Sequence, residues 1–176
     1  HSMRFTSSAG TTDSMRTALS FMKDRGLGAA ALHVEAGQAA IQQFIENAGD
    51  CRFLQSIKTF AASSLFQGTL IYAKRQSFED LMEVFLRKLK TYAGNEWKED
   101  ISTVIAGRPV RFAGSNPDEA LALARYNEAL TRAGFPEIHY VYEPVAAAYY
   151  FAQSLKKDAN VLVADFGGGT TDYSLI

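Results

Sequence analysis

Apolar side chains recur at helical spacing in two segments of the first half of the chain, 40–48 and 78–93. A glycine follows each segment, as is common where a helix ends. Before the second segment, Ser77 and Asp80 have the spacing of a capping pair, and charged residues fill the face opposite the apolar stripe. The pattern therefore predicts two amphipathic helices.

The remaining residues of this half give weaker patterns. Residues 4–13 are polar and rich in Gly, Ser and Thr, which predicts a flexible lead-in. Small apolar residues alternate loosely with polar ones over 14–34, which favours strands, and 69–73 has the pattern of a short strand. The first three residues, His1-Ser2-Met3, are typical of a cloning remnant. We expect residues 4–76 to form a small accessory subdomain.

Three apolar segments of the second half, 101–106, 138–142 and 161–166, predict strands. A helix is expected between the first two, over 117–133. Its start, Asn116-Pro117-Asp118-Glu119, supplies a cap, a proline and carboxylates suited to a helix N-terminus. Alternating strands and helices are typical of an α/β fold with a parallel core. We therefore expect the three strands to share one sheet with helices packed on it.

Composition narrows the classes of function. The chain has 176 residues, enough for one domain or slightly more, and 47% are hydrophobic, which argues against intrinsic disorder. Its 18 basic and 19 acidic residues leave a net charge of -1, so nothing favours nucleic acid or an anionic membrane as a partner. The single cysteine excludes an internal disulfide and a cysteine-built zinc site. No apolar run reaches the roughly 18–20 residues of a membrane helix, so we expect a cytosolic domain.

The most informative segment is the run Asp165-Phe166-Gly167-Gly168-Gly169-Thr170-Thr171-Asp172. The apolar residues 161–164 before it predict a strand buried on both faces. Three adjacent glycines forgo about 1.5–3 kcal/mol of stability relative to alanine, and bare backbone is useful where N–H groups approach phosphate oxygens closely. The residues expected to contact phosphate are Gly167, Gly168, Gly169, Thr170 and Thr171.

Two carboxylates flank this glycine loop. Asp165 at the end of a buried strand is costly unless it is compensated, and a hydrated Mg²⁺ would compensate it, with Asp172 in reach of the same ion. The alternative is a plain glycine hairpin turn whose two aspartates are solvated. The loop is not a Walker P-loop, because no Gly-Lys-Ser/Thr follows and residues 173–176 have the pattern of a strand.

Two further side chains are candidates for the same chemistry. Glu143 precedes Pro144 at the expected C-terminal end of the 138–142 strand, where α/β sheets bind ligands, and it could orient water or a metal shell. A glutamate and a proline at a helix start also have a purely structural explanation. Lys58 lies in the apolar run 53–60, and its structural explanation is a buried stem with a solvated ammonium group.

Together these motifs resemble the nucleotide-binding domain of the heat shock protein 70 (DnaK-like) chaperone family. The run 165–172 looks like the family's second phosphate loop. Glu143-Pro144-Val145-Ala146-Ala147-Ala148 looks like its Glu-Pro connector, and Ile57-Lys58-Thr59-Phe60 is similar to the segment with its catalytic lysine. The resemblance covers roughly residues 52–176.

The resemblance implies an α/β chain with part of the actin-like ATPase (ribonuclease H-like) fold, a mixed sheet with flanking helices and a small accessory subdomain. Residues 4–76 would be the accessory (IB-like) subdomain of lobe I and 77–160 its core (IA-like) subdomain. Residues 161–176 would be the first hairpin of lobe II, with the second phosphate loop. Residues 107–112 and 142–145 are closest to the bacterial YegD-like subgroup.

The resemblance also implies roles for individual residues. Lys58 would contact the γ-phosphate of ATP, Glu143 would position the attacking water or a metal-bound water, and Pro144 would switch between the nucleotide site and a partner surface. Asp165 and Asp172 would hold hydrated Mg²⁺ and orient the nucleophile, and the loop between them would cradle the phosphates of ATP or ADP. Phosphoryl transfer depends mainly on such positioning and charge neutralisation.

Some features of the family are not found in this sequence. The first phosphate loop, Asp-x-Gly-Thr, and the adenosine-binding motif are both missing. Thr131 stands where the family usually has an arginine, with Arg132 beside it. We therefore expect most of one lobe of a longer protein, binding nucleotide poorly by itself.

Three functions are compatible with these motifs. The first is a cytoplasmic, Mg²⁺-dependent ATPase of the heat-shock type from a bacterium, with protein clients or co-chaperones as partners. The second is a non-hydrolysing actin-like scaffold or filament subunit, which does not need Lys58 in this context. The third is a sugar or acetate kinase of the same superfamily, for which the sequence identifies no acceptor pocket.

Overall fold

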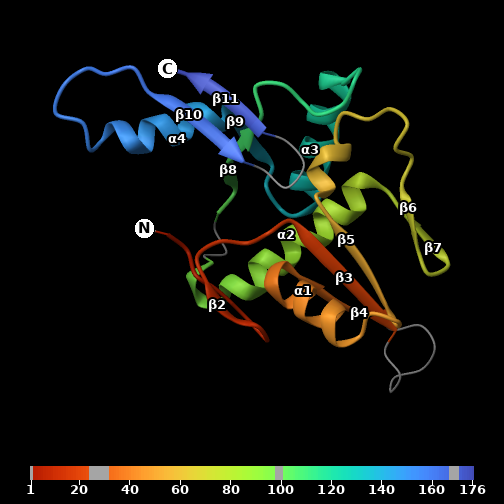
Figure 1. The fold of residues 1–176 in the computed structure, drawn as a ribbon. Coiled ribbons are helices and arrows are strands. Elements are labelled where there is room, and N and C mark those ends of the chain that lie inside the picture. Colours follow the sequence, from red (N-terminus) through yellow and green to blue (C-terminus); the bar gives the residue numbers. More distant parts are fainter. Residues whose placement is uncertain (1, 24–31, 98–100, 167–170) are drawn as a thin grey trace.

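The N-terminal part of the molecule is an antiparallel sheet covered by one helix. The computed structural model describes residues 2–23, 32–97, 101–166 and 171–176. The sheet has the strand order β4-β3-β5, with bounds Leu32–Ala36, Ala18–Lys23 and Cys51–Gln55, and α1 (Gly37–Glu46) packs on it (Figure 1). Leu19 and Phe21 of β3 are buried, so the central strand supplies much of the apolar face. The strands expected over 14–34 and the helix expected near 40–48 are confirmed, with α1 beginning three residues earlier, whereas β5 was not predicted.

The lead-in is ordered, which contradicts the flexible segment expected over residues 4–13. It forms an antiparallel hairpin of β1 (Phe5–Ser7) and β2 (Gly10–Thr12). Phe5 packs against the hydrophobic core, and the Arg4 backbone N–H donates to a Glu96 carboxylate oxygen at 2.9 Å. The hairpin was not predicted because its residues are mostly polar, and a single apolar side chain, Phe5, packs against the core.

Two long helices run through the middle of the molecule (Figure 1). α2 (Phe78–Ala93) begins with the predicted capping box, in which the Ser77 and Asp80 side chains each accept a hydrogen bond from the other's backbone N–H. α3 (Glu119–Arg132) begins two residues later than predicted. Asp118 is the N-cap of α3. Its carboxylate accepts a hydrogen bond from the Leu121 backbone N–H, three residues further along the chain, at 2.9 Å.

The main hydrophobic core joins the N-terminal sheet to these two helices. Buried side chains from both sides of position 76 belong to a single cluster. Its largest fully buried members are Phe78, Leu19, Ile71 and Leu81. A short hairpin of β6 (Thr69–Ile71) and β7 (Lys74–Gln76) contributes Ile71 to this core. The division into subdomains at about residue 76 stays a prediction.

The second half is an α/β arrangement, as expected, but its strands do not form one sheet. β8 (Thr103–Arg108) and β9 (Glu137–Tyr142) are parallel, and α4 (Glu143–Ala152) follows β9 directly. β10 (Leu162–Phe166) pairs instead with β11 (Thr171–Leu175) in a separate antiparallel hairpin beside α4 (Figure 1). The expectation of one shared sheet was wrong. The backbone of β10 forms its hydrogen bonds with β11, the next strand along the chain, and not with β8 or β9.

The strand before the glycine loop is also less buried than its sequence predicts. Leu162 and Phe166 are 67% and 74% exposed. In the part of the chain that the structure describes, β10 has one neighbouring strand, and an apolar strand is buried only where other elements cover its faces. No helix among the described residues is long and apolar enough to cross a bilayer.

Candidate phosphate-binding cleft

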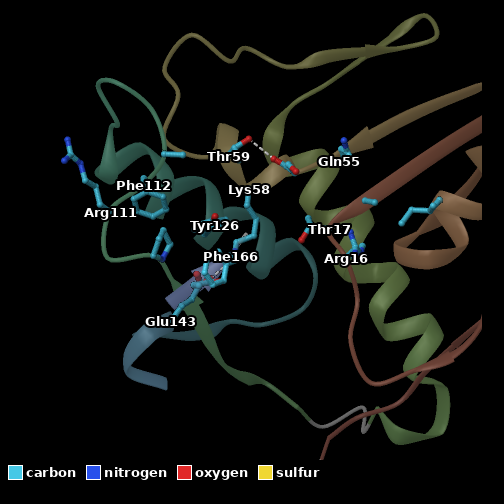
Figure 2. A pocket seen from close by; sticks show the side chains of 16 residues that line it. Arg16, Thr17, Gln55, Lys58, Thr59, Arg111, Phe112, Tyr126, Glu143 and Phe166 are labelled. Atoms are coloured by element: carbon cyan, nitrogen blue, oxygen red, sulfur yellow. Dashed lines mark hydrogen bonds and ion pairs between the residues drawn. The ribbon is translucent and has the colours of Figure 1, made fainter. Parts of the chain in front are cut away.

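A cleft of about 630 Å³ opens where the carboxyl ends of β8 and β9 meet the N-terminal sheet (Figure 2). Residues 109–113, which follow β8, line one side with Glu143, which follows β9. Residues 16–18 at the start of β3 line the other side, together with Gln55 at the end of β5 and Ser56, Lys58 and Thr59 after it, and Asp165 and Phe166 complete the wall. Ligand sites of α/β sheets lie at such carboxyl ends of parallel strands.

Lys58 and Glu143 meet inside this cleft. The Lys58 ammonium group donates to Glu143 Oε1 at 2.6 Å, and both side chains are partly exposed (Figure 2). The sequence suggested these two residues separately, from different motifs, and the fold brings them together. The Lys58 side chain is 43% exposed, so the ion pair is compatible with the alternative explanation, a solvated ammonium group, as well as with a functional role.

The backbone around Lys58 directs its side chain toward the cleft. Ser56 adopts a left-handed conformation with φ 54° and turns the chain out of β5 into a 3₁₀ helix, Ile57–Phe60. The Ile57 side chain is buried in the core, and the next residue, Lys58, is exposed to the cleft. A buried anchor beside the lysine therefore fixes the turn that carries it.

Glu143 is placed by the junction of β9 and α4. It lies in the first turn of α4, where a carboxylate is stabilised by the helix dipole, and Pro144 follows it at the helix start. Gly107 of β8 leaves room for it, because a Cβ atom at Gly107 would approach Glu143 Cγ to 2.9 Å. Gly107 lies within β8, one residue beyond the predicted strand 101–106, and accommodates the glutamate.

Tyr126 of α3 is a buried lining residue that the sequence did not single out. Its ring packs edge-on against Phe78 with centroids 5.6 Å apart, and it lies beside Lys58 in the cleft wall (Figure 2). Burial, and then the negative charge of Glu143, raise the pKa of the Tyr126 phenol above its ordinary value. The hydroxyl therefore stays protonated to a higher pH than an ordinary tyrosine, and it can donate a hydrogen bond.

The charges of the cleft suit an anionic ligand. Arg16, Lys58 and Arg111 line it together with the carboxylates of Glu143 and Asp165. Arg16 lies on the N-terminal side, and Arg111 lies at the outer edge with its guanidinium directed away from the ion pair (Figure 2). Cations on several walls raise the local concentration of polyphosphates.

The residues of the predicted phosphate loop are described in part. Asp165, the last residue but one of β10, lies on the cleft wall, and the β10–β11 ladder pairs it with Asp172. Thr171 is the first residue of β11. Gly167, Gly168, Gly169 and Thr170 lie outside the described residues, as does the side chain of Asp172. Within the described ranges, no group of three or more His, Cys, Asp or Glu side chains forms a metal site by itself.

Several residues of the cleft had no signal in the sequence. Arg16, Thr17 and Gln55 come from segments with weak strand patterns, and Tyr126 is one apolar position on a helix. What these residues share is their position in the folded chain, since they line the same cleft although they belong to different elements. Glu143 did have a signal, its position before Pro144 at the end of the predicted 138–142 strand.

Comparison with known proteins matches the part of the chain that contains Lys58, Glu143 and Asp165, whereas the cleft residues from β3, α1 and the end of β5 lie before it. The family model described as Hsp70 protein matches residues 57–176, more than half of the chain. The chain belongs to the Hsp70 protein family. The resemblance drawn from the motifs is thereby confirmed at the level of the family, and the YegD-like subgroup stays a prediction. The match favours the chaperone-type alternative over the filament and kinase alternatives.

Curated Hsp70 relatives cover similar residues. A chaperone protein HscA homolog from Rickettsia felis is 30% identical over 122 residues, 68% of this chain and 18% of that protein. An HscA homolog from Rickettsia typhi is 31% identical over 103 residues, 58% of this chain and 16% of that protein. Chaperone protein DnaK from Prochlorococcus marinus is 31% identical over 103 residues, 58% of this chain and 15% of that protein. The chain thus spans less than a fifth of the length of these relatives.

Proposed function

We propose that this chain forms part of the nucleotide-binding domain of an ATP-hydrolysing Hsp70-type chaperone, and that the cleft around Lys58 and Glu143 binds the phosphates of ATP or ADP. The observation that carries the proposal is the 2.6 Å contact in the cleft between these two side chains, both of which lie within the matched region. An ammonium group next to a carboxylate can bind a terminal phosphate oxygen on one side and a water molecule on the other.

The roles follow from the chemistry of each group. Lys58 would neutralise charge that develops on the terminal phosphate, and Glu143 would hold the attacking water in line. Tyr126, whose phenol is protonated at neutral pH, would add a neutral hydrogen-bond donor to the same wall. The actin-like ATPase fold, with the predicted subdomains 4–76, 77–160 and 161–176, would place these groups around the nucleotide.

The carboxylate of Asp165, which lies at the cleft, suits a hydrated Mg²⁺. Asp165 presents a carboxylate at the cleft, and Mg²⁺ keeps several waters while binding one or two carboxylates and substrate phosphates. Asp165 and Asp172 would hold the ion, and residues 167–171 would bind phosphate through backbone N–H groups and hydroxyls. When bound, Mg²⁺ neutralises charge on phosphate oxygens.

The functional cycle of the whole protein belongs to the same proposal. Nucleotide hydrolysis in the cleft would change the conformation of the whole protein, with Pro144 at the start of α4 as the switch between the cleft and a partner surface. Protein clients or co-chaperones would bind elsewhere on the whole protein, in the bacterial cytoplasm.

Single-turnover ATP hydrolysis by the whole protein that carries this chain tests the proposal. We expect Lys58→Ala to lower the rate by about 100-fold or more, because removing one group that stabilises transition-state charge has effects of this size. Lys74→Ala, on the exposed β6–β7 hairpin, is the matched control and should hydrolyse ATP at the wild-type rate. Equal rates for wild type and Lys58→Ala would remove Lys58 from the mechanism.

A further inference from the structure

Arg125 of α3 binds a run of backbone carbonyls just after the segment that carries Lys58. Its Nη1 atom lies 3.0 Å from the Phe60 oxygen, 2.9 Å from the Ala61 oxygen and 3.0 Å from the Ser63 oxygen. Its Nη2 atom donates to the Phe66 oxygen at 2.8 Å. One guanidinium group therefore gathers four carbonyls from residues 60–66.

The guanidinium is enclosed and its charge is compensated. The Arg125 side chain is 11% exposed, and Glu79 in the first turn of α2 lies 3.5 Å from its Nε atom. The Phe78 ring lies under it, 5.8 Å from centroid to guanidinium carbon. A planar group with five N–H donors suits such a set of acceptors, whereas a lysine ammonium has three donors and no fork.

Residues 60–66 are fixed to α3 by further contacts. The Asp118 backbone N–H, at the N-cap of α3, donates to the Ala62 oxygen at 2.9 Å. The rings of Phe60 and Phe66 stack with centroids 4.8 Å apart, which closes the loop on itself. Arg125 thus lies at the centre of a loop whose carbonyls are directed toward one helix.

The same loop continues the short helix that positions Lys58. The Ala61 N–H donates to the Lys58 oxygen at 3.1 Å, and the Thr59 N–H donates to the Ser56 oxygen at 3.0 Å. Ala61 therefore makes two hydrogen bonds: its backbone N–H donates to the Lys58 oxygen, and its carbonyl oxygen accepts from the Arg125 guanidinium. Because these two bonds share one residue, the guanidinium fixes the turn on which the lysine is presented.

We propose that Arg125 is a positioning residue for Lys58, which holds the Ile57–Phe60 turn so that the ammonium group meets Glu143 in the cleft. The part of this inference that concerns catalysis rests on the proposed function, whereas the placement of Lys58 does not. Tyr126, the next residue of α3, lines the cleft itself. The helix thus contributes one side chain that lines the cleft, Tyr126, and one that acts on the cleft through Lys58, Arg125.

Lysine acylation of the 176-residue chain tests the placement without nucleotide. The Glu143 carboxylate accepts a hydrogen bond from the Lys58 amine, so the amine should react more slowly with acetic anhydride, as read by mass spectrometry, than in a variant that lacks this contact. We expect Arg125→Met to speed acylation of Lys58 about threefold or more relative to Lys74 in the same molecule. The control is Arg132→Met on the same helix, where Arg132 pairs with Asp80 and Glu128, and it should leave Lys58 unchanged.

A second variant at the same position keeps the test informative if Arg125→Met does not fold. If circular dichroism shows that Arg125→Met is unfolded, Arg125→Lys keeps the charge but cannot reach four carbonyls, and the same increase at Lys58 is expected. Acylation of Lys58 at the wild-type rate in a folded Arg125 variant would overturn the inference.

A double-mutant cycle in the whole protein separates positioning from general stability. We expect Arg125→Met to lower kcat for ATP hydrolysis about tenfold or more with a smaller change in KM, because misplaced catalytic groups lose this much. In a Lys58→Ala background the same substitution should cause no further loss, since it acts through the lysine. Equal losses in both backgrounds would assign Arg125 a merely structural role. Should Lys58→Ala itself leave hydrolysis unchanged while acylation responds to Arg125, the proposed function fails and the placement stands.

Discussion

The Lys58 ammonium group lies 2.6 Å from Glu143 Oε1, across 85 positions of the chain. The two side chains are 43% and 31% exposed, and ion pairs of this kind contribute about 0–1 kcal/mol to stability. The importance of the contact is therefore geometric. It places an ammonium group and a carboxylate side by side in the cleft of an Hsp70-family chain, where each can interact with a different part of a phosphate ester.

Gly107→Ala tests whether the close packing beside Glu143 matters for this pair. The new Cβ atom would approach Glu143 Cγ to 2.9 Å, so the glutamate must move and its contact with Lys58 should weaken. We expect acylation of Lys58 in the 176-residue chain to rise about threefold. Gly49→Ala is the control, because a Cβ atom there has nothing within 4 Å. Similar Lys58 reactivity in both variants would mean that Gly107 does not constrain Glu143.

The capping box of α2 makes a prediction about stability. Ser77→Ala removes the hydroxyl that accepts the Asp80 N–H, and such losses lower the free energy of unfolding by about 0.5–2 kcal/mol. Urea denaturation should show this decrease, whereas Ser64→Ala at an exposed loop position should stay within about 0.5 kcal/mol of wild type. If Ser77→Ala lowers the free energy of unfolding no more than Ser64→Ala does, the capping box does not stabilise α2.

Asp80 adds a pH dependence to the same structure. The Ser77 backbone N–H, and then Arg132, hold the pKa of the Asp80 carboxyl below its ordinary value, with burial acting in the opposite direction. A lowered folded-state pKa stabilises the protein above about pH 4, the unfolded value, and this contribution is lost as the pH falls through the folded value. Asp80→Asn should therefore destabilise most at pH 7, and the difference from wild type should shrink below pH 4. A difference that is constant from pH 7 to pH 3 contradicts this assignment.

Tyr126 predicts the opposite dependence at alkaline pH. Its raised pKa, caused by burial and then by Glu143, stabilises the fold fully below about pH 10, and the contribution is lost as the pH rises above that value. Wild type should lose up to about 1.4 kcal/mol per pH unit more than Tyr126→Phe above pH 10, measured by urea denaturation. Tyr150→Phe, at a tyrosine that is 81% exposed, should follow wild type. If Tyr126→Phe also follows wild type, the phenol does not titrate as its burial requires.

The sequence was a good guide where the signal is local. The apolar stripe and cap of α2 predicted its bounds, because both arise from residues three or four positions apart. Lys58 and Glu143 were chosen from separate motifs, and the fold brings them into contact. The parallel strands β8 and β9 followed from alternating strand and helix patterns.

Other features depend on contacts that no local pattern contains. Arg125 is an ordinary helix position in the sequence, and its importance comes from carbonyls about 60 positions earlier in the chain. The β1–β2 hairpin was missed because its residues are polar and one side chain, Phe5, attaches it to the core. β10 was expected to be buried because it is apolar, although burial depends on which elements cover a strand.

The most direct test of the account is whether MgATP covers Lys58. The whole protein that carries this chain would be acylated with and without MgATP, and modification of Lys58 would be compared with that of Lys74 on the exposed β6–β7 hairpin. A phosphate-binding cleft predicts that nucleotide slows acylation of Lys58 severalfold at saturation and leaves Lys74 unchanged. Equal acylation of Lys58 with and without MgATP, under conditions where calorimetry shows the nucleotide bound, would place the phosphates elsewhere and contradict the account.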